Sequence, residues 1–190
     1  LLPAQGGKGE GSMSALLSAL STIDPALVEG LLDAAFGHDR HQRTAYLLRQ
    51  DVRQIETLSF SLMEGDALVG TIQCWPVALT SDDQMASMIL VGPVAIAPDR
   101  QNTGLGRQLM RAILDASAAM GHPPLTMIGD PEYYGRFGFR AEGTAGWSLP
   151  GPWEPHRLLL RNDGGTILPA TGMLGPDTGN IELHDKSGLV

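Results

Sequence analysis

Met88-Ile-Leu-Val-Gly-Pro-Val-Ala-Ile-Ala97 runs into Pro98-Asp-Arg-Gln-Asn-Thr-Gly-Leu-Gly106, and a helix-patterned segment follows from Arg107 to Gly121. The first piece has the continuous apolar character of a buried strand, and the second is a glycine turn. This order places free backbone N–H groups at a helix N-terminus, where a phosphate anion is stabilised. Gly104 and Gly106 lack the side chains that would keep a pyrophosphate away from the backbone. The stretch therefore predicts a site for a phosphate-bearing molecule.

The order of the other predicted elements indicates an α+β fold. Asp24-Pro25 is a typical helix start, and Gly37 ends the helix that it opens. Glu64-Gly65-Asp66 predicts a hairpin turn. Further expected elements are strands at 58–63, 67–75, 125–128 and 139–142, a short helix at 44–50, a helical turn at 133–137, and short apolar pieces at 147–149 and 157–160. This order predicts a mixed, mainly antiparallel sheet flanked by helices, with one central βαβ unit at residues 88–128.

The chain has the length of one domain. Its 190 residues are enough to bury a substantial core. Residues 1–13 show neither an initiator methionine nor a signal-peptide pattern, and we interpret them as a disordered tail or a cloning remnant. The main domain is expected at residues 14–161. Residues 162–190 show little periodicity and are expected to form a C-terminal extension of the same domain, with loops and one or two edge strands.

Composition and charge exclude several functional classes. A net charge of −8 and an isoelectric point near 4.9 argue against nucleic-acid binding, because no basic stripe is available to neutralise phosphates. No apolar run is long enough to span a bilayer. The single cysteine, Cys74, excludes an internal disulfide and predicts a reducing, cytoplasmic location. The histidines are not accompanied by the Cys or carboxylate ligands of a metal site, so no metal is expected.

Three competing motifs fail on spacing. A dinucleotide fingerprint needs a third glycine where Leu109 stands. Gly6-Gly7-Lys8-Gly9 follows no strand and lacks the Ser or Thr of a P-loop. Gly146-Trp-Ser148-Leu-Pro-Gly151 does not have the spacing of a nucleophile elbow. A nucleotide-binding domain stays an alternative, because a glycine turn alone does not identify its ligand.

Two motifs together resemble those of the GCN5-related N-acetyltransferase (GNAT) superfamily. Gln101-x-x-Gly104-x-Gly106 after Val94-x-Ile96-x-Pro98 resembles its acyl-CoA-binding motif. Tyr134-Gly-Arg-Phe-Gly138-Phe139 resembles its Tyr-x-x-x-Gly-Phe element, and the two motifs with their element order cover about residues 24–142. Phe36-Gly-His-Asp-Arg-His-Gln-Arg43 further resembles a bacterial branch, the YhbS-like predicted acetyltransferases. The resemblance implies a GNAT-type fold and acetyl-CoA as cosubstrate.

The resemblance also implies roles for the motif residues. The strand backbone would bond to pantetheine, an N–H near Ile96 would polarise the thioester carbonyl, and the N–H groups of the turn would hold the pyrophosphate. The implied cosubstrate-binding residues are Val94, Ala95, Ile96, Gln101, Asn102, Thr103, Gly104, Leu105, Gly106 and Arg107. Arg100 and Arg107 either reach phosphates or are surface arginines. Tyr134, selected over Tyr133 by the motif spacing, is the implied general acid that protonates the leaving thiolate.

The acceptor side is less defined. A general base is not identified; the candidates are Asp130, Glu132 and Glu56. The resemblance points to an acceptor pocket near the first two helices, with His38, Arg40, His41 and Arg43 as candidate residues and Trp75 and Trp147 as candidate walls. The two arginines could pair with an acceptor carboxylate or simply be solvated.

The predicted reaction is acetyl transfer from acetyl-CoA to a primary amine, directly within a ternary complex. No acyl-enzyme is expected, since Cys74 lies away from the motif. A small-molecule amine is favoured over a protein amine, and the protein is expected to be a monomer or a homodimer. The alternative from another class is a non-catalytic acyl-CoA-binding sensor or interaction module, which would need the glycine turn but not Tyr134.

Overall fold

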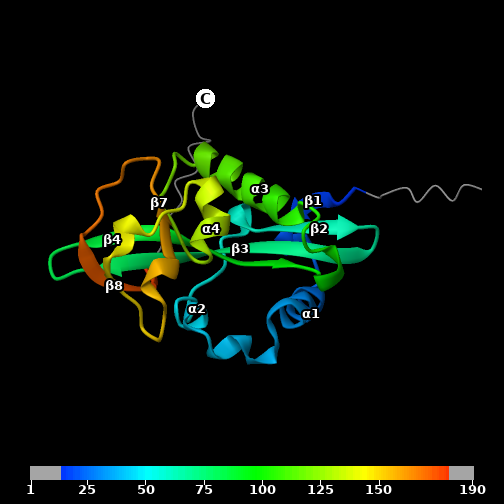
Figure 1. The fold of residues 1–190 in the computed structure, drawn as a ribbon, viewed down its shortest axis with the longest axis horizontal. Coiled ribbons are helices and arrows are strands. Elements are labelled where there is room, and N and C mark those ends of the chain that lie inside the picture. Colours follow the sequence, from blue (N-terminus) through cyan, green and yellow to red (C-terminus); the bar gives the residue numbers. More distant parts are fainter. Residues whose placement is uncertain (1–13, 180–190) are drawn as a thin grey trace, which may run out of the picture.

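The computed structural model describes residues 14–179, which form a central sheet with helices on both faces (Figure 1). Along the sheet the strand order is β1-β2-β3-β4-β5-β7, while β8 pairs with β3 and with β6. The strands are β1 (Leu16–Ala19), β2 (Phe60–Glu64), β3 (Ala67–Thr80), β4 (Met85–Ile96), β5 (Leu125–Ile128), β6 (Gly146–Ser148), β7 (Leu158–Arg161) and β8 (Thr171–Pro176). The helices are α1 (Pro25–Phe36), α2 (Thr44–Leu47), α3 (Leu105–Ala119) and α4 (Pro131–Tyr134), with short 3-10 turns between elements.

Most strand pairs are antiparallel, and β4 and β5 are parallel neighbours joined by α3. The predicted mixed sheet with a central βαβ unit is therefore confirmed. The hairpin between β2 and β3 is also confirmed, because Glu64 faces Ala67 across the predicted turn. β3 and β4 are apolar over long runs since helices cover the sheet on both sides.

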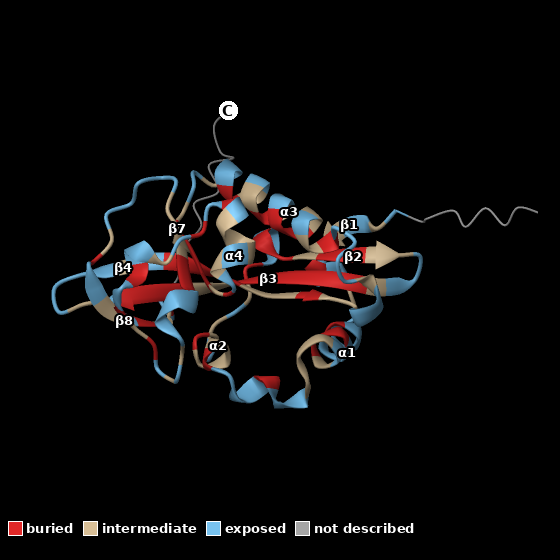
Figure 2. Ribbon diagram, in the orientation of Figure 1, coloured by how far each residue is buried: buried red, intermediate tan, exposed pale blue. Residues whose placement is uncertain are grey.

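The helices begin and end where local chemistry predicts. The Asp24 carboxylate accepts a hydrogen bond from the Ala26 N–H at 2.9 Å, Pro25 occupies the first turn, and Gly37 with φ +85° ends α1. α3 packs its apolar stripe, including Leu109 and Ile113, into the main core (Figure 2). α1 packs against the opposite face, near Ala95 of β4. The two helices thus flank the strand that precedes the glycine turn.

Some boundaries differ from the sequence prediction. Residues 139–142 were expected to be strand-like, but they contribute a single bridge, Arg140 to Leu160, and a 3-10 turn follows at Glu142–Thr144. The buried Phe139 accounts for the apolar signal there, since it packs into the core without a strand around it. β1 was not predicted. Residues 162–190 were expected to form loops and one or two edge strands; they do contain a strand, β8, but it lies between β3 and β6 and is not an edge strand.

Within residues 14–179, no helix has the length and apolar character needed to cross a membrane. The same residues contain no group of three or more His, Cys, Asp or Glu side chains arranged to hold a metal ion. Residues 1–13, expected to be a tail, and residues 180–190 lie outside the described part.

Candidate functional site

A β-bulge in β4 sets the geometry of the strand before the glycine turn. Val91 lies opposite Cys74 and Val94 lies opposite Ile72, so Gly92 and Pro93 share one partner position on β3. The described ladder between β4 and β5 ends one residue before the bulge, at the pair of Leu90 and Thr126. Because Pro93 has no N–H to donate, it cannot continue a ladder. The two parallel strands therefore separate at this point.

The bulge also turns the next backbone groups toward the opened side. The Ala97 N–H donates to Val69 O of β3, at 2.9 Å. In an antiparallel pair the residues alternate between facing the partner and facing away. Ala95 therefore shares the direction of Ala97, and Val94 and Ile96 direct their N–H and C=O groups away from β3. These backbone groups face the side of β4 from which β5 has separated, so they are available to bind a ligand there.

The glycine turn supplies the second set of free donors. Gly104 is the N-cap residue of α3 with φ +91°, a left-handed conformation that favours glycine. The first bond of the helix runs from the Gln108 N–H to Gly104 O, which leaves the N–H groups of Leu105, Gly106 and Arg107 without intrahelical partners. Around these groups lies a hollow of about 410 Å³. Free N–H groups at a helix N-terminus suit a phosphate anion.

The hollow brings together nearly all predicted cosubstrate-binding residues. Its lining is Ala35, Phe36, Val94, Ala95, Ile96, Arg100, Gln101, Asn102, Gly104, Leu105, Gly106, Arg107, Tyr133, Tyr134 and Arg136. Thr103 is the predicted residue that is not in the lining; its hydroxyl donates to Arg100 O instead. Arg100 is held by Glu64 at 2.8 Å and Asp99 at 2.7 Å, whereas Arg107 is exposed and forms no ion pair within residues 14–179.

Tyr134 lies at the end of α4, which begins at a capped turn. The Asp130 carboxylate accepts from the Glu132 N–H at 3.0 Å. Gly129 allows the Tyr134 ring to pack closely, because a Cβ at Gly129 would lie 2.7 Å from two ring carbons. Burial raises the pKa of Tyr134 to about 12, with smaller contributions from Tyr133 and Asp130. Its hydroxyl is therefore neutral near pH 7.

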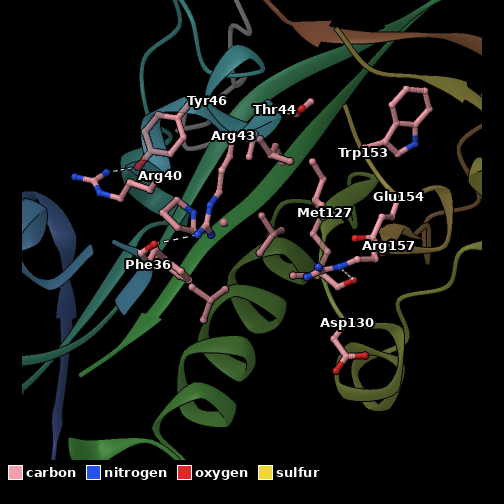
Figure 3. Close-up of a pocket in the computed structure, with 18 of the residues that line it drawn as sticks. Phe36, Arg40, Arg43, Thr44, Tyr46, Met127, Asp130, Trp153, Glu154 and Arg157 are labelled. Atoms are coloured by element: carbon pink, nitrogen blue, oxygen red, sulfur yellow. Dashed lines mark hydrogen bonds between the residues drawn. The ribbon is translucent and has the colours of Figure 1, made fainter. Parts of the chain in front are cut away.

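A second, larger cavity of about 1090 Å³ opens beside Tyr134 (Figure 3). Its walls come from the α1–α2 region, the opened stretch of β4, the end of β5 and the segment before β7. Phe36, Val94, Tyr133 and Tyr134 line both this cavity and the hollow at the glycine turn. A ligand in one can therefore meet a ligand in the other at these four residues.

The predicted acceptor residues are only partly in this cavity. Arg40 and Arg43 line it, but His38 does not; its ring pairs with Asp33 at 3.0 Å and is exposed. His41 packs against Tyr46 outside the lining. Neither predicted tryptophan forms a wall. Trp147 is buried with its indole N–H donating to Pro169 O, and Trp75 lies beneath the Arg49 guanidinium, 5.3 Å from it.

Sequence reasoning missed the residues Arg49, Trp153, Glu154 and Arg157, which line the cavity. Arg49 lies about one hundred residues before the other three, so no local spacing relates it to them. Among the candidate bases, Asp130 lines the cavity, whereas Glu132 and Glu56 do not.

Arg40 is a buried structural cation, so neither of the two expected roles, pairing with an acceptor carboxylate or being solvated, describes it. It is 2% exposed and donates to Glu29, to Asp33 at 2.7 Å and to the Tyr46 hydroxyl. Burial alone would lower the pKa of Arg40, but these hydrogen bonds outweigh it and raise that pKa. The hydrogen bond from Arg40 in turn lowers the pKa of Asp33. Arg40 therefore ties the α1–α2 loop to α1.

Replacing Arg40 by methionine should destabilise the protein by about 1–3 kcal/mol, because partly buried acceptors lose a charged donor. Urea unfolding of purified protein measures the change. Arg43→Met is the matched control, because Arg43 is exposed and donates to a single carbonyl, Phe36 O at 2.9 Å. An equal decrease in the free energy of unfolding in the two variants would show that the buried hydrogen bonds of Arg40 do not stabilise the protein more than the exposed contact of Arg43.

An acyl-CoA-dependent acyltransferase has this arrangement: β4 separates from β5, the N-terminus of α3 follows β4, and Tyr134 lies where the two meet. The sequence supports the same class. The model of the acetyltransferase (GNAT) domain family matches residues 26–141, more than half of the chain, and the chain belongs to this family. The fold and family predictions are thereby confirmed.

The relatives cover most of the chain. The uncharacterized N-acetyltransferase YhbS of Escherichia coli K12 is 29% identical over 168 residues, covering 86% of this chain and 92% of YhbS. The uncharacterized N-acetyltransferase YjhQ of the same strain is 26% identical over 153 residues, covering 80% and 82%.

Two solved structures have a similar fold. The structure of E. coli YhbS in complex with CoA superimposes with a TM-score of 0.68 at 22% identity, covering 94% of this chain and 96% of that one. A GNAT family acetyltransferase from Brucella melitensis in complex with acetyl-CoA gives a TM-score of 0.57 at 22% identity, covering 87% and 97%. Both are structures of GNAT family proteins with a CoA ligand.

Proposed function

We propose that this acetyltransferase transfers the acetyl group of acetyl-CoA directly to a small-molecule primary amine within a ternary complex. The observation that carries the proposal is the shared boundary of the two hollows, at Phe36, Val94, Tyr133 and Tyr134. Acetyl-CoA would lie with its pyrophosphate on the turn at Gly104 to Arg107 and its pantetheine along Val94 to Ile96. The amine would enter from the larger cavity. Thioester and amine then meet beside Tyr134.

The chain supplies three functions to this transfer. The amine nitrogen attacks the thioester carbonyl carbon, a C–N bond forms and the C–S bond breaks. A free N–H of Val94 or Ile96 stabilises the negative charge that develops on the carbonyl oxygen. The Tyr134 hydroxyl gives its proton to the leaving thiolate and recovers one from solvent. The amine loses its proton to solvent or to Asp130, the candidate base that lines the cavity.

Direct transfer is favoured because Cys74, the single thiol of the chain, is poorly placed for a covalent intermediate. Cys74 is fully buried in the core beneath α3, and burial raises its pKa. It is therefore a protonated packing residue.

We further propose that residues 14–161 form the catalytic domain and that 162–190 extend it. The pairing of β8 with β3 and β6 supports an extension that is integral to the sheet. A monomer is the simplest state, because both hollows are lined by one chain; a homodimer is the alternative.

The first test is ligand selectivity by thermal shift. Acetyl-CoA and CoA should raise the melting temperature, whereas ATP and NAD should not, because binding to the native state stabilises it by mass action. Release of free CoA in the presence of a panel of amines then separates an enzyme from a non-catalytic module. Stabilisation by CoA with no turnover of any amine would favour the module. Preference for ATP or NAD would favour a nucleotide-binding domain.

A further inference from the structure

The cavity beside Tyr134 has an excess of uncompensated positive charge. Arg43, Arg49 and Arg157 line it, and none forms an ion pair with a residue of the described range 14–179. The carboxylates of the same cavity are those of Asp130 and Glu154. A ligand with a negative group would therefore balance the charge of the lining.

Arg49 is the least solvated of these cations without a counterion. Its guanidinium carbon lies 3.7 Å from the centre of the Tyr46 ring, and its Nε donates to Ala45 O at 3.1 Å. Burial lowers the pKa of Arg49, and the Tyr46 hydroxyl, which also accepts a hydrogen bond from Arg40, offsets this lowering only in part. The aromatic ring holds the guanidinium plane in place, which leaves its terminal nitrogens to bind a planar anion edge-on.

Both carboxylates of the lining lie on the other side of the cavity, and together they outweigh the one arginine there, Arg157. Figure 3 shows Arg43 on the wall next to Phe36, and Asp130, Glu154 and Arg157 on the facing wall. Asp130 begins the turn that carries Tyr134, and its carboxylate contributes to the raised pKa of that tyrosine. A positively charged amine is therefore attracted toward Tyr134, and an anion toward the α1–α2 wall.

We propose that the acceptor is a primary amine that also carries a carboxylate, with Arg49 as the binding partner of that carboxylate and Arg43 as a second contact. The inference rests on the proposed function, since it concerns the acceptor of the same transfer. A carboxylate is preferred over a phosphate, because the charge of Arg43, Arg49 and Arg157 exceeds that of Asp130 and Glu154 by one, which a monoanion balances and a dianion exceeds.

The unaltered protein tests the substrate class. Rates are compared for a series of ω-amino carboxylates, the alkylamines of equal length, and the corresponding aminoalkyl phosphates. We expect KM for the best amino carboxylate to be about 10- to 100-fold below that of its alkylamine, as for loss of one charge-assisted hydrogen-bond pair. A lower KM for the aminoalkyl phosphates than for the amino carboxylates would overturn the carboxylate assignment. If the alkylamines had the same KM as the anionic amines, recognition of any anion would be overturned.

Arg49→Met tests the residue. It keeps an unbranched stem and removes the charge, and it should raise KM for the amino carboxylate about 10-fold or more while KM for the alkylamine changes less than about twofold. Arg111→Met, on the exposed side of α3, is the control. Isothermal titration of the amino carboxylate into the CoA complex provides a readout without turnover. Unchanged affinity in Arg49→Met would refute the role of Arg49.

The two proposals can fail separately. If alkylamines are acetylated as efficiently as amino carboxylates, the transfer stands and the acceptor inference is wrong. If acetyl-CoA binds but no amine is acetylated, the proposed function fails. In that case, amino-carboxylate binding that depends on Arg49 would still support the recognition site, and no such binding would overturn it.

Discussion

Tyr134→Phe should lower kcat by about 100- to 1,000-fold, because a general acid typically contributes that much to rate. The affinity for acetyl-CoA should stay within about twofold, since the ring and its packing on Gly129 are kept. The burial that raises the pKa of Tyr134 keeps the proton on the phenol at neutral pH, so the hydroxyl is available as a donor. Single-turnover acetyl transfer and acetyl-CoA titration measure the two quantities.

Tyr133→Phe is the matched control for that experiment. Tyr133 lines both hollows as Tyr134 does, and the two rings meet edge to face at 4.8 Å. Its hydroxyl lies over the glycine turn, where a Cβ at Gly106 would be 3.0 Å away. We expect a change in kcat below about fivefold, because this hydroxyl is not assigned to the leaving thiolate. If kcat fell strongly in Tyr133→Phe and stayed unchanged in Tyr134→Phe, the general acid would be Tyr133 and not Tyr134.

Gly104→Glu should weaken acetyl-CoA binding by about 100-fold or more, because it places a carboxylate at the helix N-terminus that is proposed to hold the pyrophosphate. A Cβ at Gly104 would meet no atom within 4 Å, so the substitution starts without a steric clash and the fold should persist. The positive φ of +91° adds a backbone strain of about 1 kcal/mol, which lowers the melting temperature slightly. Isothermal titration with acetyl-CoA measures the loss.

Gly104→Gln separates charge from strain in this test. It has the same shape and the same backbone penalty as Gly104→Glu but no charge. Its affinity for acetyl-CoA should therefore fall between those of the wild type and the glutamate variant. Full affinity for acetyl-CoA in Gly104→Glu, with a melting temperature equal to that of Gly104→Gln, would mean that the pyrophosphate lies away from this turn.

Sequence reasoning predicted the central part of the fold because its determinants are local. The apolar run, the turn glycines and the amphipathic helix follow one another in residues 88–128, so their order defines the βαβ unit. β1 was missed because it is short and carries exposed leucines, which give no alternation of apolar and polar residues. β8 contains Gly172, Gly175 and Pro176, which are poor strand formers; its conformation depends on pairing with β3.

The cosubstrate-binding residues could be predicted from the sequence and most of the acceptor cavity could not, again because only the former are local in the sequence. The residues proposed to bind the cosubstrate lie within one stretch, so motif spacing could select them. The acceptor cavity combines the α1–α2 region with the segment before β7, and no single-sequence pattern relates these distant pieces. One signal was present but unused: Glu29 and Asp33 are one helical turn apart on α1, a spacing that can hold a buried arginine such as Arg40.

β8 gives the least periodic part of the chain a structural role that the sequence does not suggest. Leu174 is fully buried and packs in the same core cluster as Trp147, while Thr171 to Pro176 bridge β6 and β3. A truncation after residue 161 would therefore uncover apolar core and leave the end of β3 with unpaired backbone groups. Such an exposed edge is a template for intermolecular pairing. Removing a segment that looks dispensable in the sequence is therefore expected to make the protein aggregate.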